Sequence, residues 1–419
     1  MKQHYTFAIV GAGPAGTTCA HALLRSGDAN IALIDKACFP RDKICGDGIG
    51  PGAVAILNAL GLRGVLDGHR RVERIVVTSP LGRRMALEVG TLNRPMPLGY
   101  VIPRIIFDNA LFEAAVDRGA TDLTGWSLET ASCSGRRWEL TLAATGAKNA
   151  TSPKEVRTVT ADILIGADGA TSRVRRLLNQ PLNGDKHNSI AVRVLAKSDR
   201  SFPAHQEINV IEGLPRPGYG WIFFSGSEHI NIGCGCDIRA YRSEKRSLTQ
   251  LLALYKAYLE TVWPSALRYD EVTCHTAPLP LASHMPRLAF PDRNAALIGD
   301  AASMINPLTG EGIFYGMEAG FQLGSRLAES QKRNAKLNTA DALSDFETSF
   351  RRKFTPHFRG NYFLRHVIDR PRFMELMVEA CAADDELCCD YMDYMLGNET
   401  GLADKPLFQI VLKTILQCN

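Results

Sequence analysis

Short apolar runs, each followed by small residues, recur three times along the chain, and in the second and third an acid comes next. Residues 7–10 lead into a glycine-spaced turn, residues 163–165 into Ala167-Asp168-Gly169, and residues 295–298 into Gly299-Asp300. Continuous apolar runs of this length are typical of strands buried on both faces of a parallel sheet. The pattern therefore predicts an α/β unit whose strands come from distant parts of the chain.

The first of these turns has the glycine spacing of a nucleotide-binding unit. Gly11, Gly13 and Gly16 follow the strand, residues 15–24 read as a helix, and the next apolar run ends on Asp35. The three glycines permit a tight turn, a close approach to a pyrophosphate and close packing of helix on strand, in that order. The helix N-terminus favours phosphate, and an acid nineteen residues after Gly16 can accept hydrogen bonds from ribose.

Between residues 187 and 276 the pattern changes to short alternating runs at hairpin spacing, together with one amphipathic helix. This favours an antiparallel sheet with a helical cover, inserted between two parts of the nucleotide-binding unit. The predicted strands are 190–194, 207–211, 220–224 and 229–233, and the predicted helix is 247–258.

The whole pattern predicts an α/β fold in three parts: a Rossmann-like domain of residues 1–186 and 277–335, a substrate-binding antiparallel sheet of residues 187–276, and a C-terminal helical region of residues 336–419. Further predicted elements are hairpins at 74–89 and 126–138, a surface loop at 147–158, and helices at 53–57, 104–116, 313–327, 340–354, 363–368, 374–382 and 407–416.

Composition narrows the class of protein. With 45% hydrophobic and 22% charged residues, the chain can bury a large core, and its net charge of +4 over 419 residues is too mild to indicate nucleic-acid binding. The eleven cysteines are scattered and odd in number, and the chain does not begin like a secretory signal, so we expect reduced thiols, no metal site and a cytoplasmic protein. No apolar stretch reaches membrane-spanning length, which leaves peripheral membrane contact open.

Three acid-ended strands imply one extended cofactor whose two ends are held by distant segments. FAD meets this demand better than NAD, because its ribityl chain and ring need the second and third sites. The chain has no second GxGxxG unit, so we expect NADPH or NADH to bind only transiently, as the reductant.

Several candidate residues have a plain structural alternative. Cys45 lies near Arg41 and Lys43, which could lower the pKa of its thiol, yet it could equally be a buried inert cysteine. Tyr219 and Trp221 alternate with glycine and could line a substrate site or pack in a core. Further alternatives apply to two other features: Asp300 can bind a ribityl chain or cap a helix, and the arginines of 172–177 can form a solvated helix face.

The motifs together resemble the flavoprotein superfamily of aromatic hydroxylases, flavin-dependent halogenases and geranylgeranyl reductases. Residues 40–46 are similar to the PxxKxCG segment of the geranylgeranyl reductase family, 219–223 to its YxWxFP motif and 299–312 to its GDAAGxxxPxTGEG pattern. Two positions depart from these patterns: Phe224 stands in place of proline, and Ser303 in place of glycine.

The resemblance implies that Gly11, Gly13, Gly16 and Asp35 hold the AMP half of FAD and that Arg104 contacts its phosphate or ribityl region. Asp168 and Gly169 would support FAD and the visiting nicotinamide, and Cys45 would lie beside the flavin ring as the catalytic residue. Tyr219 and Trp221 would line a prenyl pocket. The full set of expected cofactor-binding residues is Gly11, Gly13, Ala15, Gly16, Asp35, Lys36, Arg41, Gly46, Arg104, Asp168, Gly169, Asp300, Pro307, Gly310, Glu311 and Gly312.

The resulting hypothesis is an FAD-dependent oxidoreductase that reduces carbon–carbon double bonds of a prenyl or other hydrophobic substrate by hydride transfer. Its proton donor stays open between Cys45, Tyr219 and water. The alternatives are a monooxygenase or halogenase of aromatic substrates acting through a flavin hydroperoxide, although the halogenase motif WxWxIP is missing, and a flavin-binding or lipid-carrying protein without turnover. The sequence leaves the oligomeric state open.

Overall fold

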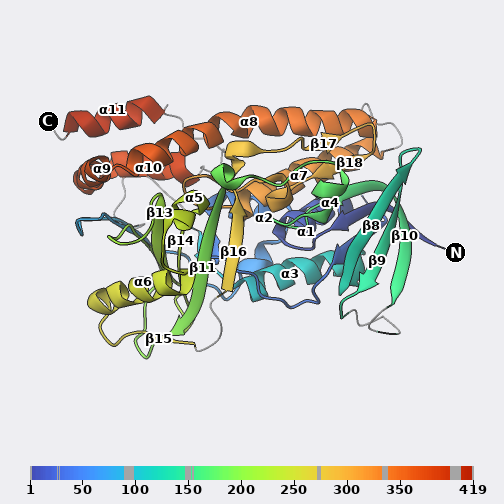
Figure 1. Cartoon of the computed structure of the whole chain (residues 1–419). Helices are drawn as coiled ribbons and strands as arrows, with labels where there is room; N and C mark the ends of the chain where they lie inside the picture. Colours follow the sequence, from blue (N-terminus) through green and yellow to red (C-terminus); the bar gives the residue numbers. More distant parts are fainter. Residues whose placement is uncertain are drawn as a thin grey trace.

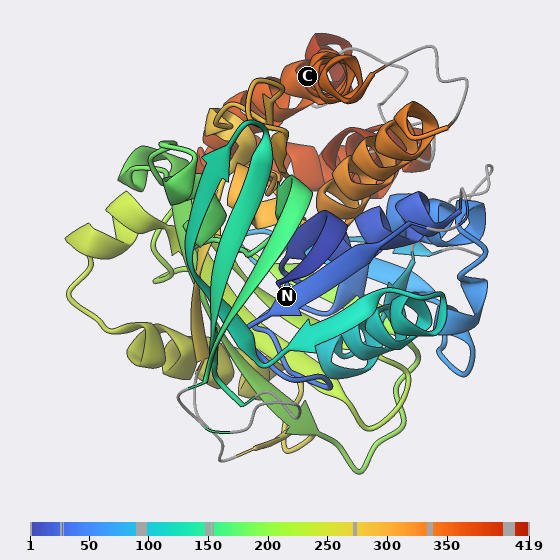
Figure 2. The ribbon, with the colours of Figure 1, turned by 90° about the vertical axis from the view of Figure 1, so that its right-hand side faces the viewer.

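Two large sheets and the helices that pack against them make up most of the molecule (Figure 1). The computed structural model describes residues 2–25, 27, 29–88, 99–146, 152, 155–270, 275–332, 338–396 and 407–417. The parallel sheet and the mainly antiparallel sheet lie side by side, and the C-terminal helices run across one side of both (Figures 1 and 2). The expected α/β fold is confirmed.

The parallel sheet brings the three acid-ended strands together. β1 (Gln3–Val10) pairs in parallel with β2 (Ile31–Asp35) on one side and with β10 (Val156–Gly166) on the other, and β10 pairs in parallel with β18 (Ala295–Leu297). Their carboxyl ends therefore meet at one edge, where ligands bind in open α/β sheets. Further members are β7 (Thr121–Thr124), β17 (Ala289–Phe290) and the hairpin of β8 (Trp126–Ser134) and β9 (Arg137–Ala144).

Helices cover the parallel sheet at the glycine-spaced turn after β1. α1 (Pro14–Leu24) packs tightly on α7 (Ile313–Ser330), and a Cβ at Gly320 would lie 2.3 Å from the Ala15 carbonyl oxygen. The small residues of α7 thus fix the position of α1. The other helices here are α2 (Pro51–Ala59), α3 (Arg104–Asp117) and α4 (Arg173–Leu177), and a small ladder joins β3 (Gly48–Ile49) to β6 (Tyr100–Val101).

The second sheet is larger than the predicted insertion. Its order is β15 (Arg268–Tyr269), β11 (Asn188–Lys197), β14 (Ile230–Asp237), β13 (Gly218–Phe224), β12 (His205–Asn209), β4 (Arg74–Thr78) and β5 (Arg84–Glu88), with β16 (His275–Pro280) also on β11. The hairpin β4–β5 thus joins from outside residues 187–276, since β4 pairs in parallel with β12. α5 (Ile238–Ser243) follows β14, and α6 (Leu248–Val262) packs on one face.

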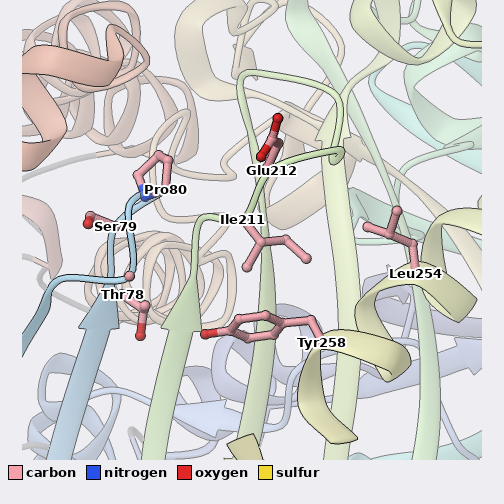
Figure 3. Close-up of a pocket in the computed structure, with 8 residues that line it drawn as sticks. Thr78, Ser79, Pro80, Ile211, Glu212, Leu254 and Tyr258 are labelled. Carbon is pink, nitrogen blue, oxygen red and sulfur yellow. The ribbon is translucent and has the colours of Figure 1, made fainter. Parts of the chain in front are cut away.

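The two faces of this sheet have different neighbours. A Cβ at Gly220 would lie 2.4 Å from the Tyr255 ring, so this residue faces α6. Its neighbour Trp221 faces the opposite way, toward the loop of Cys45 and Gly46, because successive side chains in a strand alternate. One cavity of about 260 Å³ lies on the α6 side (Figure 3). It contains none of the predicted site residues, and its lining is Thr78, Ser79, Pro80, Gly82, Ile211, Glu212, Leu254 and Tyr258.

Three predictions of local structure need correction. α8 (Thr339–Ile368) continues through Pro356 as one helix instead of two, because Phe346, Phe350, Phe354 and Phe358 are fully buried along one stripe on both sides of the proline. This burial outweighs the roughly 3 kcal/mol that an internal proline costs. α10 (Asp385–Leu396), between α9 (Pro371–Ala383) and α11 (Leu407–Gln417), was not predicted.

The third correction concerns the loop predicted at 147–158. Residues 156–158 belong to β10 and pair with β9. Residues 152 and 155 are the other described members of this segment, and the rest of it lies outside the described residues. Short 3-10 turns occur at Arg63–Leu66, Asp185–His187, Ala282–His284 and Gly299–Ala302. Within the described ranges, no helix is both long and apolar enough to cross a membrane.

Candidate active site

Contacts link the predicted site residues into one continuous region. Arg41 reaches the fingerprint turn, where its Nη2 would lie 3.3 Å from a Cβ at Gly13. Lys43, two residues later, places its Nζ 2.9 Å from Asp300 Oδ2. On the far side, the Tyr219 hydroxyl would lie 3.0 Å from a Cβ at Gly310. The region thus runs from the N-terminus of α1 to the second sheet.

Two of the fingerprint glycines, Gly11 and Gly16, lie directly against backbone. Gly11 has φ +105°, and a Cβ there would lie 2.1 Å from the Ala167 oxygen. A Cβ at Gly16 would lie 1.9 Å from the Gly11 oxygen. Asp35 accepts one backbone N–H on each carboxylate oxygen, from Ala12 at 3.0 Å and from Ala37 at 2.9 Å. Each oxygen keeps a second lone-pair direction, which is available to ribose hydroxyls.

A buried charge cluster lies behind this turn. The Arg104 guanidinium forms two hydrogen bonds to Asp108, at 2.6 and 2.7 Å, and Arg41 Nη1 lies 3.1 Å from the same carboxylate. Desolvation opposes the charge on Arg104, but Asp108 outweighs it and raises the pKa of Arg104. Asp108 was not among the predicted residues, although its position four residues after Arg104 is a recognisable helical ion-pair spacing.

Asp300 lies three residues after β18, in the 3-10 turn Gly299–Ala302, and forms an ion pair with Lys43. Desolvation acts to raise the pKa of its carboxyl, but the Lys43 ammonium, together with Arg104, holds this pKa below the ordinary value. The nearby Ser303 has φ 56°, a left-handed conformation that glycine adopts without strain. Its hydroxyl accepts a hydrogen bond from Arg175 Nη1 at 2.7 Å, which anchors the serine in this position.

The glycine loop before α7, residues 306–312, is held by hydrogen bonds from its own side chains to its backbone and to the start of α7. Asn306 Oδ1 accepts N–H groups of Leu308 and Thr309, and Glu311 Oε1 accepts the N–H of Phe314 at 2.8 Å. Desolvation raises the pKa of Glu311. The loop also meets the second sheet, since the Tyr219 hydroxyl donates to the Thr309 oxygen at 2.6 Å.

Asp168, in the segment after β10, binds the start of the next helix, α4. Both oxygens of Asp168 are engaged, because they accept from the Ser172 hydroxyl and from the N–H groups of Arg173 and Val174 at the start of α4. Gly169 has φ +80° and open space where a side chain would be. The expected support of FAD and nicotinamide by Asp168 and Gly169 stays a prediction.

The basic turn of α4 is only partly the solvated face considered from the sequence. Arg176 is exposed, but Arg175 is 1% exposed and bonds to the Pro181 oxygen and to Asn183 as well as Ser303. Of the remaining expected residues, Lys36 is exposed, Ala15 lies on the first turn of α1 and Pro307 is buried beside the glycine loop.

The Cys45 sulfur lies among hydrogen-bond donors. It receives the Arg104 guanidinium and the backbone N–H of Asp47, yet burial dominates and raises the pKa of the thiol. The nearby cations therefore do not make Cys45 a thiolate. The next residue, Gly46, leaves room for the second sheet, since a Cβ there would lie 3.0 Å from the Phe223 ring and 3.5 Å from Trp221 Nε1.

The two predicted substrate aromatics come from neighbouring positions of β13. The Tyr219 and Trp221 ring centroids are 6.4 Å apart, with the ring planes at 64° to each other. Trp221 is 7% exposed, so most of its surface already packs against protein. Desolvation raises the pKa of Tyr219 to about 12, so its hydroxyl stays protonated at neutral pH. Their contact with a substrate stays a prediction.

The arrangement fits FAD. No side chain caps the first-turn N–H groups of α1, which leaves its N-terminus open to a phosphate group. At α7 the Glu311 carboxylate already accepts the N–H of Phe314, so the first turn of this helix is partly occupied. Arg41 and Lys43 add positive charge in the same region. Across the described residues, no cluster of histidine, cysteine or acidic side chains could hold a metal ion.

Comparison with known proteins identifies the family. Residues 4–347 match the model of the FAD binding domain family. The chain belongs to this family of FAD-dependent oxidoreductases. Its curated relatives include the menaquinone reductase of Mycolicibacterium smegmatis, which is 32% identical over 90% of this chain and 87% of the relative. Another is the chloroplastic geranylgeranyl diphosphate reductase of Nicotiana tabacum, 26% identical over 90% of this chain and 77% of the relative.

Solved structures agree with this FAD-dependent oxidoreductase in fold. A geranylgeranyl bacteriochlorophyll reductase-like protein from Thermoplasma acidophilum matches with a TM-score of 0.79 and 18% identity, over 100% of this chain and 97% of the other. The myxobacterial halogenase CndH matches with a TM-score of 0.72 and 15% identity, over 99% of this chain and 96% of the other. The resemblance expected from the motifs is therefore confirmed at the level of family and fold.

Proposed function

We propose that this oxidoreductase reduces a carbon–carbon double bond in the prenyl chain of a hydrophobic lipid, with a prenylated quinone as the first substrate to test. The observation that carries the proposal is the position of the Cys45 thiol. It lies between the Arg104 guanidinium and the rings of Tyr219 and Trp221 on β13, which we call the aromatic wall. The menaquinone reductase at 32% identity supports the quinone as the class of lipid.

The residues would divide the binding of FAD between them. The fingerprint glycines and Asp35 would hold the AMP half, Arg41 and Arg104 the phosphate region, Asp300 the ribityl chain, and residues 310–312 the ring edge. Hydride transfer is the chemistry that FAD supplies when bound, and we propose NADPH or NADH as the transient donor. The N–H groups at the N-terminus of α1 would bind negative charge on the cofactor.

Reduction of an alkene also needs one proton for the second carbon. Cys45 is the better donor, because the Tyr219 hydroxyl already donates its hydrogen to the Thr309 oxygen. The Cys45 thiol would give its S–H proton to the second carbon of the double bond. The Arg104 guanidinium and the Asp47 N–H would stabilise the thiolate that remains. A proton taken up from solvent then restores the thiol, so each reduced double bond gains one hydride and one proton.

The substrate test uses the purified flavin-containing protein, NADPH and menaquinone or geranylgeranyl diphosphate. Reduction of a prenyl double bond yields a product that is heavier by H2 and stays so in air, whereas a reduced quinone ring reoxidises. Mass spectrometry after exposure to air therefore identifies the bond that was reduced. A purified protein without flavin, or no stable H2 gain with any prenyl lipid, would contradict the proposal.

A second measurement separates the reductase from a monooxygenase. The flavin is reduced without oxygen, mixed with oxygen, and followed by its absorbance. A reductase should return directly to the oxidised spectrum. A long-lived intermediate spectrum, with hydroxylated product from an aromatic substrate, would favour the monooxygenase.

Replacement of the thiol tests the assignment of Cys45. Cys45→Ala should retain FAD and accept electrons from NADPH, but its turnover of the prenyl substrate should fall by about 100-fold or more, in the range of general acid catalysis. Stopped-flow flavin reduction and steady-state product formation measure the two steps separately. Unchanged turnover would mean that Cys45 only packs.

The protonation of Cys45 can be measured directly. Because burial raises the pKa of its thiol, the thiolate fraction at any given pH should lie below that of a free cysteine. Alkylation of Cys45 by iodoacetamide, followed by peptide mass spectrometry, should therefore lag behind that of glutathione as the pH rises. Alkylation that starts at lower pH than glutathione would show a thiolate and contradict the role as proton donor.

A further inference from the structure

A buried polar cluster joins the Cys45 loop to the second sheet. Its centre is Asp47, a fully buried residue with φ 64° whose Oδ2 accepts from Asn231 Nδ2 at 2.6 Å and lies 2.9 Å from His229 Nε2. Its Oδ1 accepts the N–H of Arg104 at 3.3 Å. The carboxylate therefore binds three groups from two other segments of the chain.

Asn231 connects the Asp47 carboxylate to the Cys45 loop and to the Trp221 ring. It is fully buried on β14, and its Nδ2 also donates to the Cys45 backbone oxygen at 2.8 Å. Its Oδ1 accepts the indole N–H of Trp221 at 2.9 Å. One amide thus binds the cysteine loop with its donor end and the aromatic wall with its acceptor end.

This arrangement goes beyond what packing requires. Asn231 hydrogen-bonds both the Asp47 carboxylate and the Trp221 indole N–H. These bonds join the Cys45 loop to two strands of the second sheet, which are distant from it in the sequence. Buried polar groups are costly unless every partner is in place, so such a cluster allows only one relative position of its members. His229, whose side chain is 20% exposed, forms its solvent-facing end.

We propose that Asp47, Asn231 and His229 form a positioning unit that fixes the Cys45 thiol relative to the Trp221 ring. Given the proposed function, on which this inference rests, the unit sets the distance between the proton donor and the wall that places the prenyl chain. The side chains of the three residues act through Cys45 and Trp221, and of the unit only the backbone N–H of Asp47 contacts the Cys45 sulfur.

Asn231→Leu tests the unit, because leucine has nearly the same shape and removes all three hydrogen bonds. Turnover should fall by about 10- to 100-fold with little change in KM, as expected when a reacting group shifts by a fraction of an ångström to 1 Å. FAD content and flavin reduction by NADPH should stay within about twofold, because neither depends on Trp221. Iodoacetamide labelling of Cys45 should become faster.

Asn209→Leu is the matched control. Asn209 is another buried asparagine of the same sheet, but it bonds to the Tyr255 hydroxyl at 2.8 Å on the α6 side. This variant should lose stability without a change in Cys45 labelling or in flavin reduction. His229→Gln, at the exposed end, serves as a second test variant that folds even if Asn231→Leu does not, and it should show the same labelling change to a smaller extent.

The readouts separate this inference from the proposed function. If wild-type protein reduces no prenyl lipid, the proposed function fails, while faster Cys45 labelling in Asn231→Leu and His229→Gln still supports the positioning unit. If both variants fold and label Cys45 at the wild-type rate, the unit is overturned, whatever the substrate. Equal labelling changes in Asn209→Leu would also overturn it, because they would show a general loosening of the sheet.

Discussion

Gly16→Ala should abolish FAD binding and destabilise the fold. The added Cβ would lie 1.9 Å from the Gly11 oxygen and 3.2 Å from the Ile9 side chain, so it meets backbone that cannot move aside. Relief of this clash must displace either α1 or the turn that we propose to hold the pyrophosphate, and overpacking of this kind costs about 1–3 kcal/mol or more. The flavin-to-protein absorbance ratio and the thermal unfolding midpoint measure the two effects.

The control for this variant is Gly184→Ala. Gly184 has φ −73°, and nothing lies within 4 Å of an added Cβ, so alanine there should change neither flavin content nor unfolding. A Gly16→Ala protein that purified with a full complement of flavin would mean that α1 does not approach the cofactor.

Arg104→Met should have the second large effect, because it breaks a buried ion pair. Asp108 is fully buried, and Arg41 alone would then balance its charge. Removal of one partner of a buried pair costs about 3–5 kcal/mol. The pKa of Cys45 should rise further, since the guanidinium favours its thiolate. Chemical denaturation and the pH dependence of Cys45 alkylation report these two changes.

A double variant separates stability from function. Arg104→Met combined with Asp108→Leu removes both charges, so part of the lost stability should return. We expect Arg104→Met also to lower FAD binding and turnover, because Arg104 is proposed to bind the phosphate region. In the double variant these two properties should not return, since the guanidinium is still missing. If the double variant bound FAD as well as wild type, Arg104 would have a purely structural role.

Local signals in the sequence were sufficient for the nucleotide-binding unit. The spacing of Gly11, Gly13 and Gly16 acts within one turn, and the acid-ended strands required only short-range patterns, so this part of the fold could be predicted. The continuous α8 could not, because the rule against internal proline is local, whereas the burial of phenylalanines on both sides of Pro356 depends on tertiary packing.

The site residues divide in the same way. Cys45 stood out through its motif, but Asp47 and Asn231 are separated by 184 positions, and no periodicity connects them. At Asp168 the local pattern is present but ambiguous. An acid after a strand looks the same in sequence whether it binds a ligand or the N–H groups at the start of α4. Only the three-dimensional partners distinguish these cases.

The packing of α7 on α1 has a consequence for synthesis of the protein. The helix that presents the fingerprint is supported by residues near position 320, such as Gly320 against Ala15. A nascent chain that has emerged only as far as the second sheet therefore carries every fingerprint glycine but lacks the support that holds α1 in place. We therefore expect FAD to bind late in synthesis, only after α7 has emerged and packed on α1.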